Sequence, residues 1–568
     1  MFFLFTTNLQ KNCHTGKLLY PFVLGSYVVF VNLRNLNEII TDEARIGKDV
    51  IESLTLGMYE DCRFIYREYI QNAADQVDKA VKSLLLEKGA EEIHVQINRE
   101  QRSIMVEDNA TGIPQEKVMP ILRNVAHSTK KRGIDKGFRG IGRLGGLGYC
   151  SKLIFETSYY GEDVKSVMTW DAEKLKSIIN DRTNEAEAKD VLMQVTELKT
   201  EKEDKETHYF KVILVNVTLD ELLDVESVRE YLSMVAPVDI SSKFIFRSKI
   251  NQYMEKNGLT VDTYNIYING EQIFKPYTSN IYIIKNKTGG KEISDEIKDV
   301  EFFVNKDEDG NIIYWGWYSL SKLLGQMKPI NIARGIRLRK ENIQIGDEEI
   351  CKKFFKASGD QRFSYYFFGE IHAVSKDLIP NSRRDYFGEN KACTSFERSI
   401  EQQFSQLKDL CYQALDLRTC QKTIAKKEEV QEKIRSKEKN GYTSDEEKNK
   451  LNSELENLKI KAAKEERKRK NIINNLNDSN SPLMKVFNDI KTETPTSLPQ
   501  QSFSSNLNPS SSLPPKKTIY RTDAPKYSSY TKQERKLIGK IYASIENAIP
   551  DEKKREALIS KIEEDLTR

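Results

Sequence analysis

Three polar residues at helical spacing are the first candidates for chemistry. Glu68, Asn72 and Asp75 fall at i, i+4 and i+7 in the segment FIYREYIQNAADQVDKAVKSLL, so they share one face of a predicted helix, beside an apolar stripe. A carboxylate and an amide one turn apart can orient a water molecule and hold Mg²⁺ through its hydration shell, which phosphoryl transfer requires. Taken alone, this pattern is more typical of the solvated face of an amphipathic helix.

A second motif, VEDNATGIP, follows two segments with strand alternation. It places Asp108 at a strand end, before a turn that contains Gly112 and Pro114. A carboxylate held there can accept a hydrogen bond from an adenine amino group, which distinguishes adenine from guanine. In isolation, a simple Asx turn is the better interpretation.

A glycine-rich segment, GFRGIGRLGGLG, runs from Gly137 to Gly148 and is preceded by His127-Ser128-Thr129-Lys130. Its glycines let backbone N–H groups approach phosphate oxygens, and a helix predicted to start near Leu147 adds its positive end. No Gly-Lys-Ser/Thr closes the segment, so it is not a Walker loop, and it does not directly follow a strand as a Rossmann fingerprint would. The alternative is a flexible, basic surface loop.

Taken together, the motifs E-x-x-x-N-A-x-D, D-N-x-x-G-I, S-T-K and G-x-x-G-x-G resemble, in order and spacing, the GHKL superfamily of ATP-binding proteins, which have the Bergerat fold. The resemblance implies that Glu68 is the general base or orients the attacking water, that Asn72 is the Mg²⁺ ligand, and that Asp108 reads adenine. Gly112 would pack under the base, beside a lid from about 124 to 148. The other implied ATP-binding positions are Asp75, Ser128, Thr129, Lys130, Gly137, Gly140, Gly142 and, for the threonine that follows the lid in the family, Thr207. Ala110 departs from the pattern, because it replaces the first glycine of the second motif.

The segment GEIHAVSKDLIPNSRRDYF is similar to the catalytic loop of the ninety-kilodalton heat-shock chaperones, which supplies an arginine to the γ-phosphate. Either Arg383 or Arg384 would be that arginine, since a guanidinium stays charged and forks onto phosphate oxygens. A surface turn with an arginine paired to Asp385 is the alternative. This resemblance covers roughly residues 46–390 and implies a slow, homodimeric ATPase that acts on a protein client. The helical C-terminal part also looks like MORC-type ATPases, which would instead act as ATP-gated clamps on DNA.

The elements that must position these residues alternate between helical and strand patterns, which predicts an α/β fold, here a two-layer α+β sandwich, followed by a second α/β domain. Apolar residues at coiled-coil spacing then predict an antiparallel helical hairpin, with a dimeric coil as the alternative. Its seam contains Ile400, Phe404, Leu407, Cys411 and Ala414, and resumes at Leu451, Leu455, Leu458 and Ala462 after a capping box at Ser444 and Glu447. A disordered Ser- and Pro-rich linker, with at most a short helix near Met484, and a small C-terminal helical hairpin follow. The expected boundaries are 1–45, 46–220, 221–394, 395–477, 478–528 and 529–568.

Composition excludes several classes. The 568 residues contain 89 Lys and Arg against 85 Asp and Glu, so a net charge of +4 does not suggest a chain whose main task is to coat nucleic acid. Seven scattered cysteines without a C-x-x-C pair indicate neither a disulfide framework nor a zinc site, and favour a reducing cytoplasm. The apolar stretch from Leu18 to Val31 is too short for a membrane span and is expected to be an extra strand or a poorly ordered extension.

Overall fold

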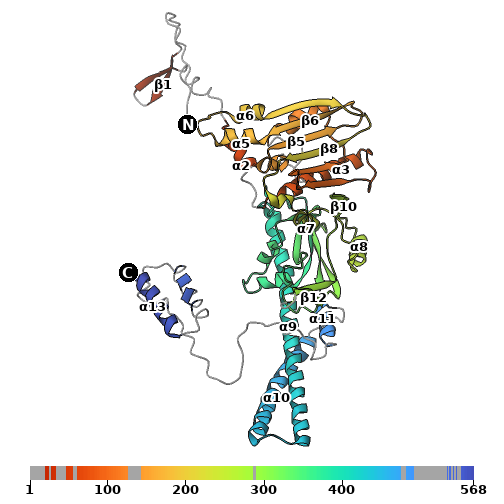
Figure 1. Ribbon diagram of the computed structural model, residues 1–568, viewed down its shortest axis with the longest axis vertical. Coiled ribbons are helices and arrows are strands. Elements are labelled where there is room, and N and C mark those ends of the chain that lie inside the picture. Colours follow the sequence, from red (N-terminus) through yellow and green to blue (C-terminus); the bar gives the residue numbers. More distant parts are fainter. Residues whose placement is uncertain are drawn as a thin grey trace, which may run out of the picture. The chain divides into compact units, whose positions relative to one another are not determined.

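Figure 1 shows a computed structural model of the chain. It describes residues 19–24, 27–32, 46–55, 61–125, 142–285, 289–474, 481–491 and 552–567, together with positions 534, 537, 538, 541, 542 and 545. The chain divides into two compact units, Met1–Leu498 and Pro499–Arg568. Among the described residues, no helix is both long and apolar enough to cross a membrane.

The first unit contains an eight-stranded sheet in the order β10-β9-β3-β4-β8-β5-β6-β7. Its strands are β3 (Ile93–Asn98), β4 (Ser103–Asp108), β5 (Lys152–Ser158), β6 (Val164–Asp171), β7 (Thr196–Lys202), β8 (Tyr209–Val215), β9 (Ile266–Ile268) and β10 (Glu271–Gln272). All neighbours pair antiparallel except β3 and β9. The sheet agrees with the expected α/β fold. It corrects one assignment, because YNIYING was placed in the second domain, whereas β9 and β10 extend the first sheet.

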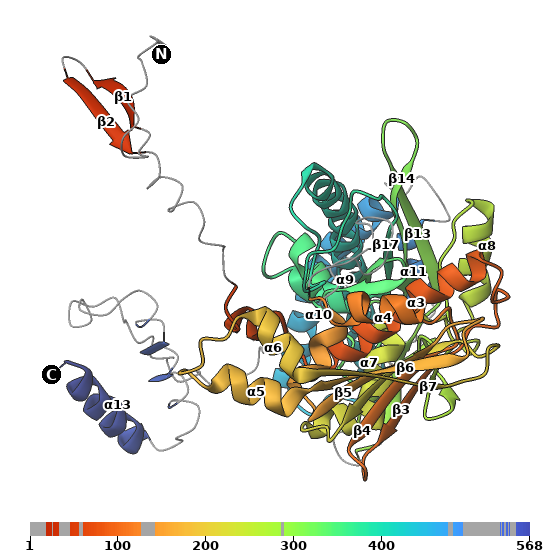
Figure 2. The same ribbon diagram turned by 90° about the horizontal axis from the view of Figure 1, so that it is seen from above.

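Helices pack against one face of this sheet (Figure 2). They are α2 (Asp49–Thr55), α3 (Phe64–Lys82), α4 (Gln115–Leu122), α5 (Ala172–Asn180) and α6 (Ala188–Val195). Most of the predicted apolar stripe of α3 is buried in the core with Ile104 and Val106 of β4, namely Ile65, Tyr69, Ala73 and Val77. Leu84, which was expected to end the stripe, lies beyond α3 and is 91% exposed. Tyr66, on another side of α3, is also buried, and its hydroxyl donates to the carbonyl of Leu222 at 2.6 Å. Helix α3 is therefore enclosed on more than one side, unlike an ordinary surface helix.

A five-stranded sheet follows, in the order β13-β14-β17-β15-β16. Its strands are β13 (Asp299–Lys306), β14 (Ile312–Leu320), β15 (Gly335–Lys340), β16 (Ile343–Ile345) and β17 (Phe368–Ala373). Strands β15 and β17 are parallel and the other pairs are antiparallel. The predicted strands at IYWGWYSL and GIRLRKENIQI are β14, β15 and β16. The elements η2 (Asp220–Leu223) and α7 (Val225–Val235) contribute buried residues to the core of the eight-stranded sheet. Other elements are α8 (Arg247–Lys256), β11 (Asn280–Ile284), β12 (Lys291–Glu296), η3 (Ile350–Phe354) and η4 (Gln361–Tyr366).

Two long helices, α9 (Lys391–Asn440) and α10 (Asp445–Asn474), lie antiparallel after the second sheet (Figure 1). The expected coiled-coil seam from Ile400 to Ala414 packs into the core with β14 and β17, and only the end of α10 reaches this core, through Ile472 and Ile473. The two helices contact each other from Asp416, which pairs with Lys468 at 2.7 Å, to a distal apolar cluster of Val430, Ile434 and Leu458. At the turn, Ser444 accepts from the N–H of Glu447 at 3.2 Å, but the Glu447 carboxylate accepts from Thr443 rather than Ser444, so the capping box is incomplete.

Helix α11 (Pro482–Lys491) lies within the range expected as linker, and it buries Leu483, Val486 and Phe487 in the core shared with α9. In the second unit, α13 (Glu552–Thr567) contributes Ile559 to a small apolar cluster with Ile538 and Tyr542. Near the N-terminus, β1 (Leu19–Leu24) and β2 (Tyr27–Asn32) form an antiparallel hairpin.

Candidate functional site

Helix α3 carries Glu68, Asn72 and Asp75, and the structure encloses this face. Asp75 is buried, and Asn72 is partly buried. The Glu68 side chain is 14% exposed, and its Oε1 lies 3.5 Å from the Arg67 guanidinium. The polar face is therefore not a solvated face, the alternative that its pattern alone favoured.

Gly142, at the start of η1 (Gly142–Gly148), lies directly against Glu68. A Cβ atom at Gly142 would be 2.1 Å from Glu68 Oε2, so a larger residue here would displace the Glu68 carboxylate. This contact joins the end of the glycine-rich segment to the candidate catalytic carboxylate. The expected site residues Ser128, Thr129, Lys130, Gly137 and Gly140 lie outside the described residues.

Asp108 ends β4 and is 3% exposed. Burial raises the pKa of the Asp108 carboxyl to about 7, and the negative charge of Glu107 adds to this shift. The N–H of Ala110 donates to the Asp108 carboxyl at 3.1 Å and opposes the shift. A buried carboxyl with one hydrogen bond has acceptor capacity left for a polar ligand. Ala110 has no positive φ, so alanine fits a turn in which the family pattern has glycine.

The turn after Asp108 is held against β5. Gly112 has a φ of 65°, and a Cβ there would lie 1.9 Å from the carbonyl oxygen of Ser158. The adjacent N–H of Ile113 donates to the hydroxyl of Thr157 at 2.8 Å, and that hydroxyl donates to the carbonyl of Tyr209 at 3.0 Å. Thr157 was not predicted as a site residue, because a threonine near a strand end is common and nothing in its local sequence marks it.

Thr207, the candidate for the family's threonine, precedes β8. Its carbonyl accepts from the Ser158 hydroxyl at 3.0 Å, and its N–H donates to the carbonyl of Asp204 at 3.0 Å. These contacts use its backbone. The residue of β8 that pairs with Asp108 is instead Phe210.

The loop that contains Arg383 and Arg384 follows the five-stranded sheet and contacts α3, which packs on the eight-stranded sheet. The guanidinium of Arg67 donates to the carbonyl of Arg383 at 3.1 Å, while the Arg383 side chain is exposed. Arg384 is buried, and its pKa is lowered. Burial is the main cause of this shift and the Arg67 charge adds to it, whereas the Glu68 carboxylate opposes it. Its φ of 54° turns the chain, and its carbonyl accepts from the N–H of Gly346 at 2.7 Å. Arg384 is therefore buried and interacts electrostatically with Glu68, whereas Arg383 is exposed.

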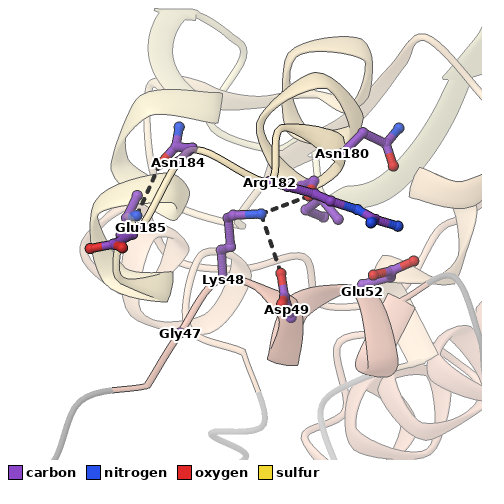
Figure 3. A pocket seen from close by; sticks show the side chains of 10 residues that line it. Gly47, Lys48, Asp49, Glu52, Asn180, Arg182, Asn184 and Glu185 are labelled. Atoms are coloured by element: carbon purple, nitrogen blue, oxygen red, sulfur yellow. Dashed lines mark hydrogen bonds and ion pairs between the residues drawn. The ribbon is translucent and has the colours of Figure 1, made fainter.

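Two other polar features lie nearby. A groove of about 670 Å³ lies beside α2 (Figure 3). Its Lys48 donates to the carbonyl of Ile179 at 2.7 Å, and this hydrogen bond connects the start of α2 to α5.

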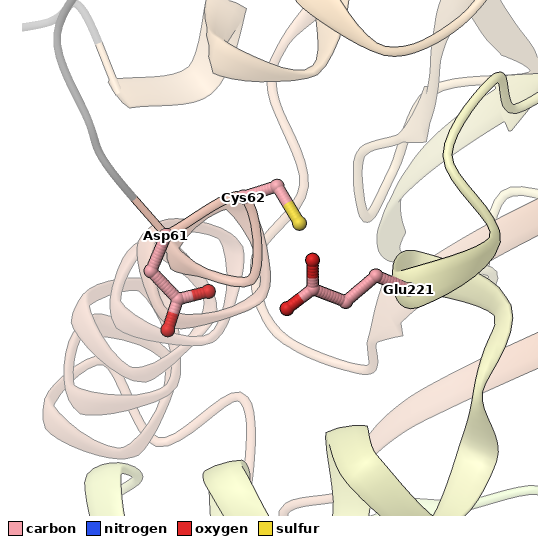
Figure 4. Close-up of side chains that lie close together, drawn as sticks. All are labelled: Asp61, Cys62 and Glu221. Atoms are coloured by element: carbon pink, nitrogen blue, oxygen red, sulfur yellow. The ribbon is translucent and has the colours of Figure 1, made fainter. Parts of the chain in front are cut away.

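Before α3, the Cys62 thiol lies close to the carboxylates of Asp61 and Glu221 (Figure 4). Burial, followed by these two carboxylates, raises the pKa of the thiol to about 12, so it stays protonated and unreactive at neutral pH.

Comparison with known proteins identifies one part of the chain. Residues 67–207 match the family model of histidine kinase-, DNA gyrase B- and HSP90-like ATPases. No curated protein matches the chain. The matched span covers about a quarter of the sequence and includes Glu68, Asn72, Asp108 and Gly112. It supports an ATP-binding domain of the GHKL type that includes strands β3 to β7 of the eight-stranded sheet.

Proposed function

We propose that this protein binds and slowly hydrolyses ATP in a site completed by both sheets, and that the nucleotide drives a conformational change acting on a protein client. The observation that supports the proposal is the contact of the loop after the five-stranded sheet with α3: the Arg383 carbonyl accepts from Arg67 at 3.1 Å, and the buried Arg384 interacts electrostatically with Glu68. A cation from another domain can stabilise charge that develops at the γ-phosphate, in a geometry that depends on domain closure.

The residues fit ATP and Mg²⁺ in the chemistry of their donors. Asp108 offers a buried acceptor for the adenine amino group, and Gly112 leaves the turn beside it without a side chain. Asn72 would hold Mg²⁺, an ion that neutralises charge on the phosphates. Glu68, one turn away, would orient the attacking water or take its proton. Arg384 would contact the γ-phosphate, and its burial keeps water from screening its charge.

The decisive experiment separates binding from turnover. Asp108→Asn should abolish binding of a non-hydrolysable ATP analogue in calorimetry, while Glu68→Ala should bind it and lose turnover. Glu107→Gln is the matched control, because it removes one charge next to Asp108 on the outer side, where Glu107 pairs with Lys211 at 3.4 Å. Normal binding by Asp108→Asn would overturn the site.

A second candidate function is an ATP-gated clamp on DNA. The observation that favours it is the basic segment KAAKEERKRK on α10, in which Lys461, Lys464, Arg467 and Lys470 are exposed. Cations on one helix can bind a phosphate backbone, although a solvated charged face has the same composition. ATPase assays of the full chain with duplex DNA and with an unfolded protein distinguish the two functions, since each predicts stimulation by one substrate only.

A further inference from the structure

The strand order places an aromatic residue beside the candidate adenine-reading carboxylate. Strand β8 lies between β4 and β5, and the register pairs Phe210 with Asp108 on one side and with Thr157 on the other. These three residues form one row across three strands. Directly paired residues of antiparallel strands have their side chains on the same face, so Asp108, Phe210 and Thr157 share a face.

That face is the one covered by α3. Residues two and four positions further along β8, Val212 and Leu214, are buried in the core of the eight-stranded sheet. The intervening Lys211 lies on the opposite face, where its ammonium is 3.4 Å from Glu107 and 3.8 Å from Glu156. Phe210 therefore points to the side of the sheet where the proposed nucleotide site lies, and Lys211 points away from it.

Phe210 differs from its neighbours in exposure. Asp108 and Thr157 are 3% and 1% exposed, and Val212 is buried, whereas Phe210 is only partly buried at the edge of the core. Its ring stacks on Phe155 with centroids 5.9 Å apart and an interplanar angle of 22°. Phe155 thus fixes the orientation of the ring, while part of the Phe210 side chain remains accessible beside the acceptor that would read the base.

We propose that Phe210 is a specificity-determining residue whose ring packs against the purine base of the bound nucleotide, next to the edge that Asp108 reads. This inference rests on the proposed function, because it assigns the base end of the same site. A partly exposed aromatic ring offers contact area that is tolerant of base identity, and a paired carboxylate adds discrimination by hydrogen bonding. A purine covers more of the ring than a pyrimidine, so Phe210 favours purines and Asp108 selects adenine among them.

Calorimetry on the full chain tests the inference with two probes, a non-hydrolysable ATP analogue and inorganic tripolyphosphate, which has no base. Phe210→Ala should weaken binding of the ATP analogue about tenfold, the order expected for base stacking on an aromatic side chain, and leave binding of tripolyphosphate unchanged. Phe210→Leu keeps apolar volume and guards against misfolding; it should weaken binding of the analogue by about threefold. Tyr209→Phe is the matched control on the opposite face, where the Tyr209 hydroxyl donates to Glu156 at 2.6 Å, and it should bind like wild type.

The outcomes separate this inference from the proposed function. If wild type binds the ATP analogue and both Phe210 variants bind it equally well, the assignment of Phe210 is wrong and the proposed function stands. If both probes weaken in parallel in Phe210→Leu, the ring supports the fold rather than the base, and the inference is again overturned. If wild type binds no ATP analogue, the proposed function fails, and this inference fails with it.

Discussion

The pKa of Asp108 predicts that adenine binding depends on pH. Burial raises this pKa from 3.8 to about 7, so near neutral pH the empty site holds a mixture of carboxyl and carboxylate. The adenine amino group is a donor and prefers the ionised acceptor. Binding should therefore pull the carboxyl toward its ionised form and lower its pKa, and affinity should rise as the pH passes through about 7.

The size of this effect follows from the same value. With a pKa of about 7, roughly one tenth of the sites are ionised at pH 6 and nine tenths at pH 8, so the affinity should be about tenfold weaker at the lower pH. Folding shows the opposite sign. Because the folded chain binds this proton more tightly than the unfolded chain, the free energy of unfolding should fall as the pH rises from about 4 to 7, by up to about 4 kcal/mol for this group.

Calorimetric titration with adenosine provides the assay, since adenosine carries no phosphate that titrates in this range. Asp108→Asn removes the titrating group, so any residual binding should be independent of pH. His208 is the matched control: its Nδ1 lies 2.7 Å from the Ala110 carbonyl on the same turn, and His208→Asn should keep the pH dependence of wild type. A pH profile that persists in Asp108→Asn, or disappears in His208→Asn, would refute the assignment to Asp108.

Three further outcomes are expected. Arg384→Ala should lower kcat on the order of 10²-fold with little change in ATP affinity, whereas Arg383→Ala, whose side chain is exposed, should retain activity; equal rates for both variants in a steady-state assay would contradict this. Gly112→Ala should lower the Tm and abolish binding of the ATP analogue, since its Cβ would meet a backbone oxygen at 1.9 Å. Glu370→Ala should cost about 3 to 5 kcal/mol in denaturant unfolding, because it leaves Lys275 and Arg339 buried without their shared carboxylate.

Site residues that lie together because of their spacing on one helix could be predicted from the sequence. Residues that lie together because of the order of strands in the sheet could not. Glu68, Asn72 and Asp75 share a helix face by spacing alone, and the structure keeps them together on α3. Thr157 and Phe210 are far from Asp108 in the chain, and they join its row only because β8 inserts between β4 and β5. No periodicity in these segments encodes that order.

Two further differences have the same origin in long-range packing. The apolar positions from Ile400 to Ala414 have the spacing of a seam whether the partner is a helix or a sheet, so the sequence could not tell that α9 covers the five-stranded sheet. The choice between Arg383 and Arg384 depends on the positive φ of Arg384 and on its contact with Gly346. Neighbouring arginines in a loop give no signal of which side chain turns inward.

The two-domain mechanism also determines which fragment can test it. A fragment that ends near Asn216 would lack β9, which pairs with β3, and Leu222, which accepts the hydroxyl of Tyr66 on α3. Poor turnover by that fragment would therefore have two causes that the assay does not separate, a disturbed α3 and the loss of Arg384.

A fragment of residues 46–273 keeps the complete eight-stranded sheet, including Ile273 in its core, and still lacks the arginine loop. It should bind the ATP analogue and hydrolyse ATP as poorly as full-length Arg384→Ala, because both lack the cation that would stabilise charge at the γ-phosphate. Circular dichroism and thermal unfolding would establish that the fragment is folded before its rate is compared. Hydrolysis by the folded fragment at the rate of the full chain would show that the first sheet and its helices suffice, and that the loop around Arg384 is structural.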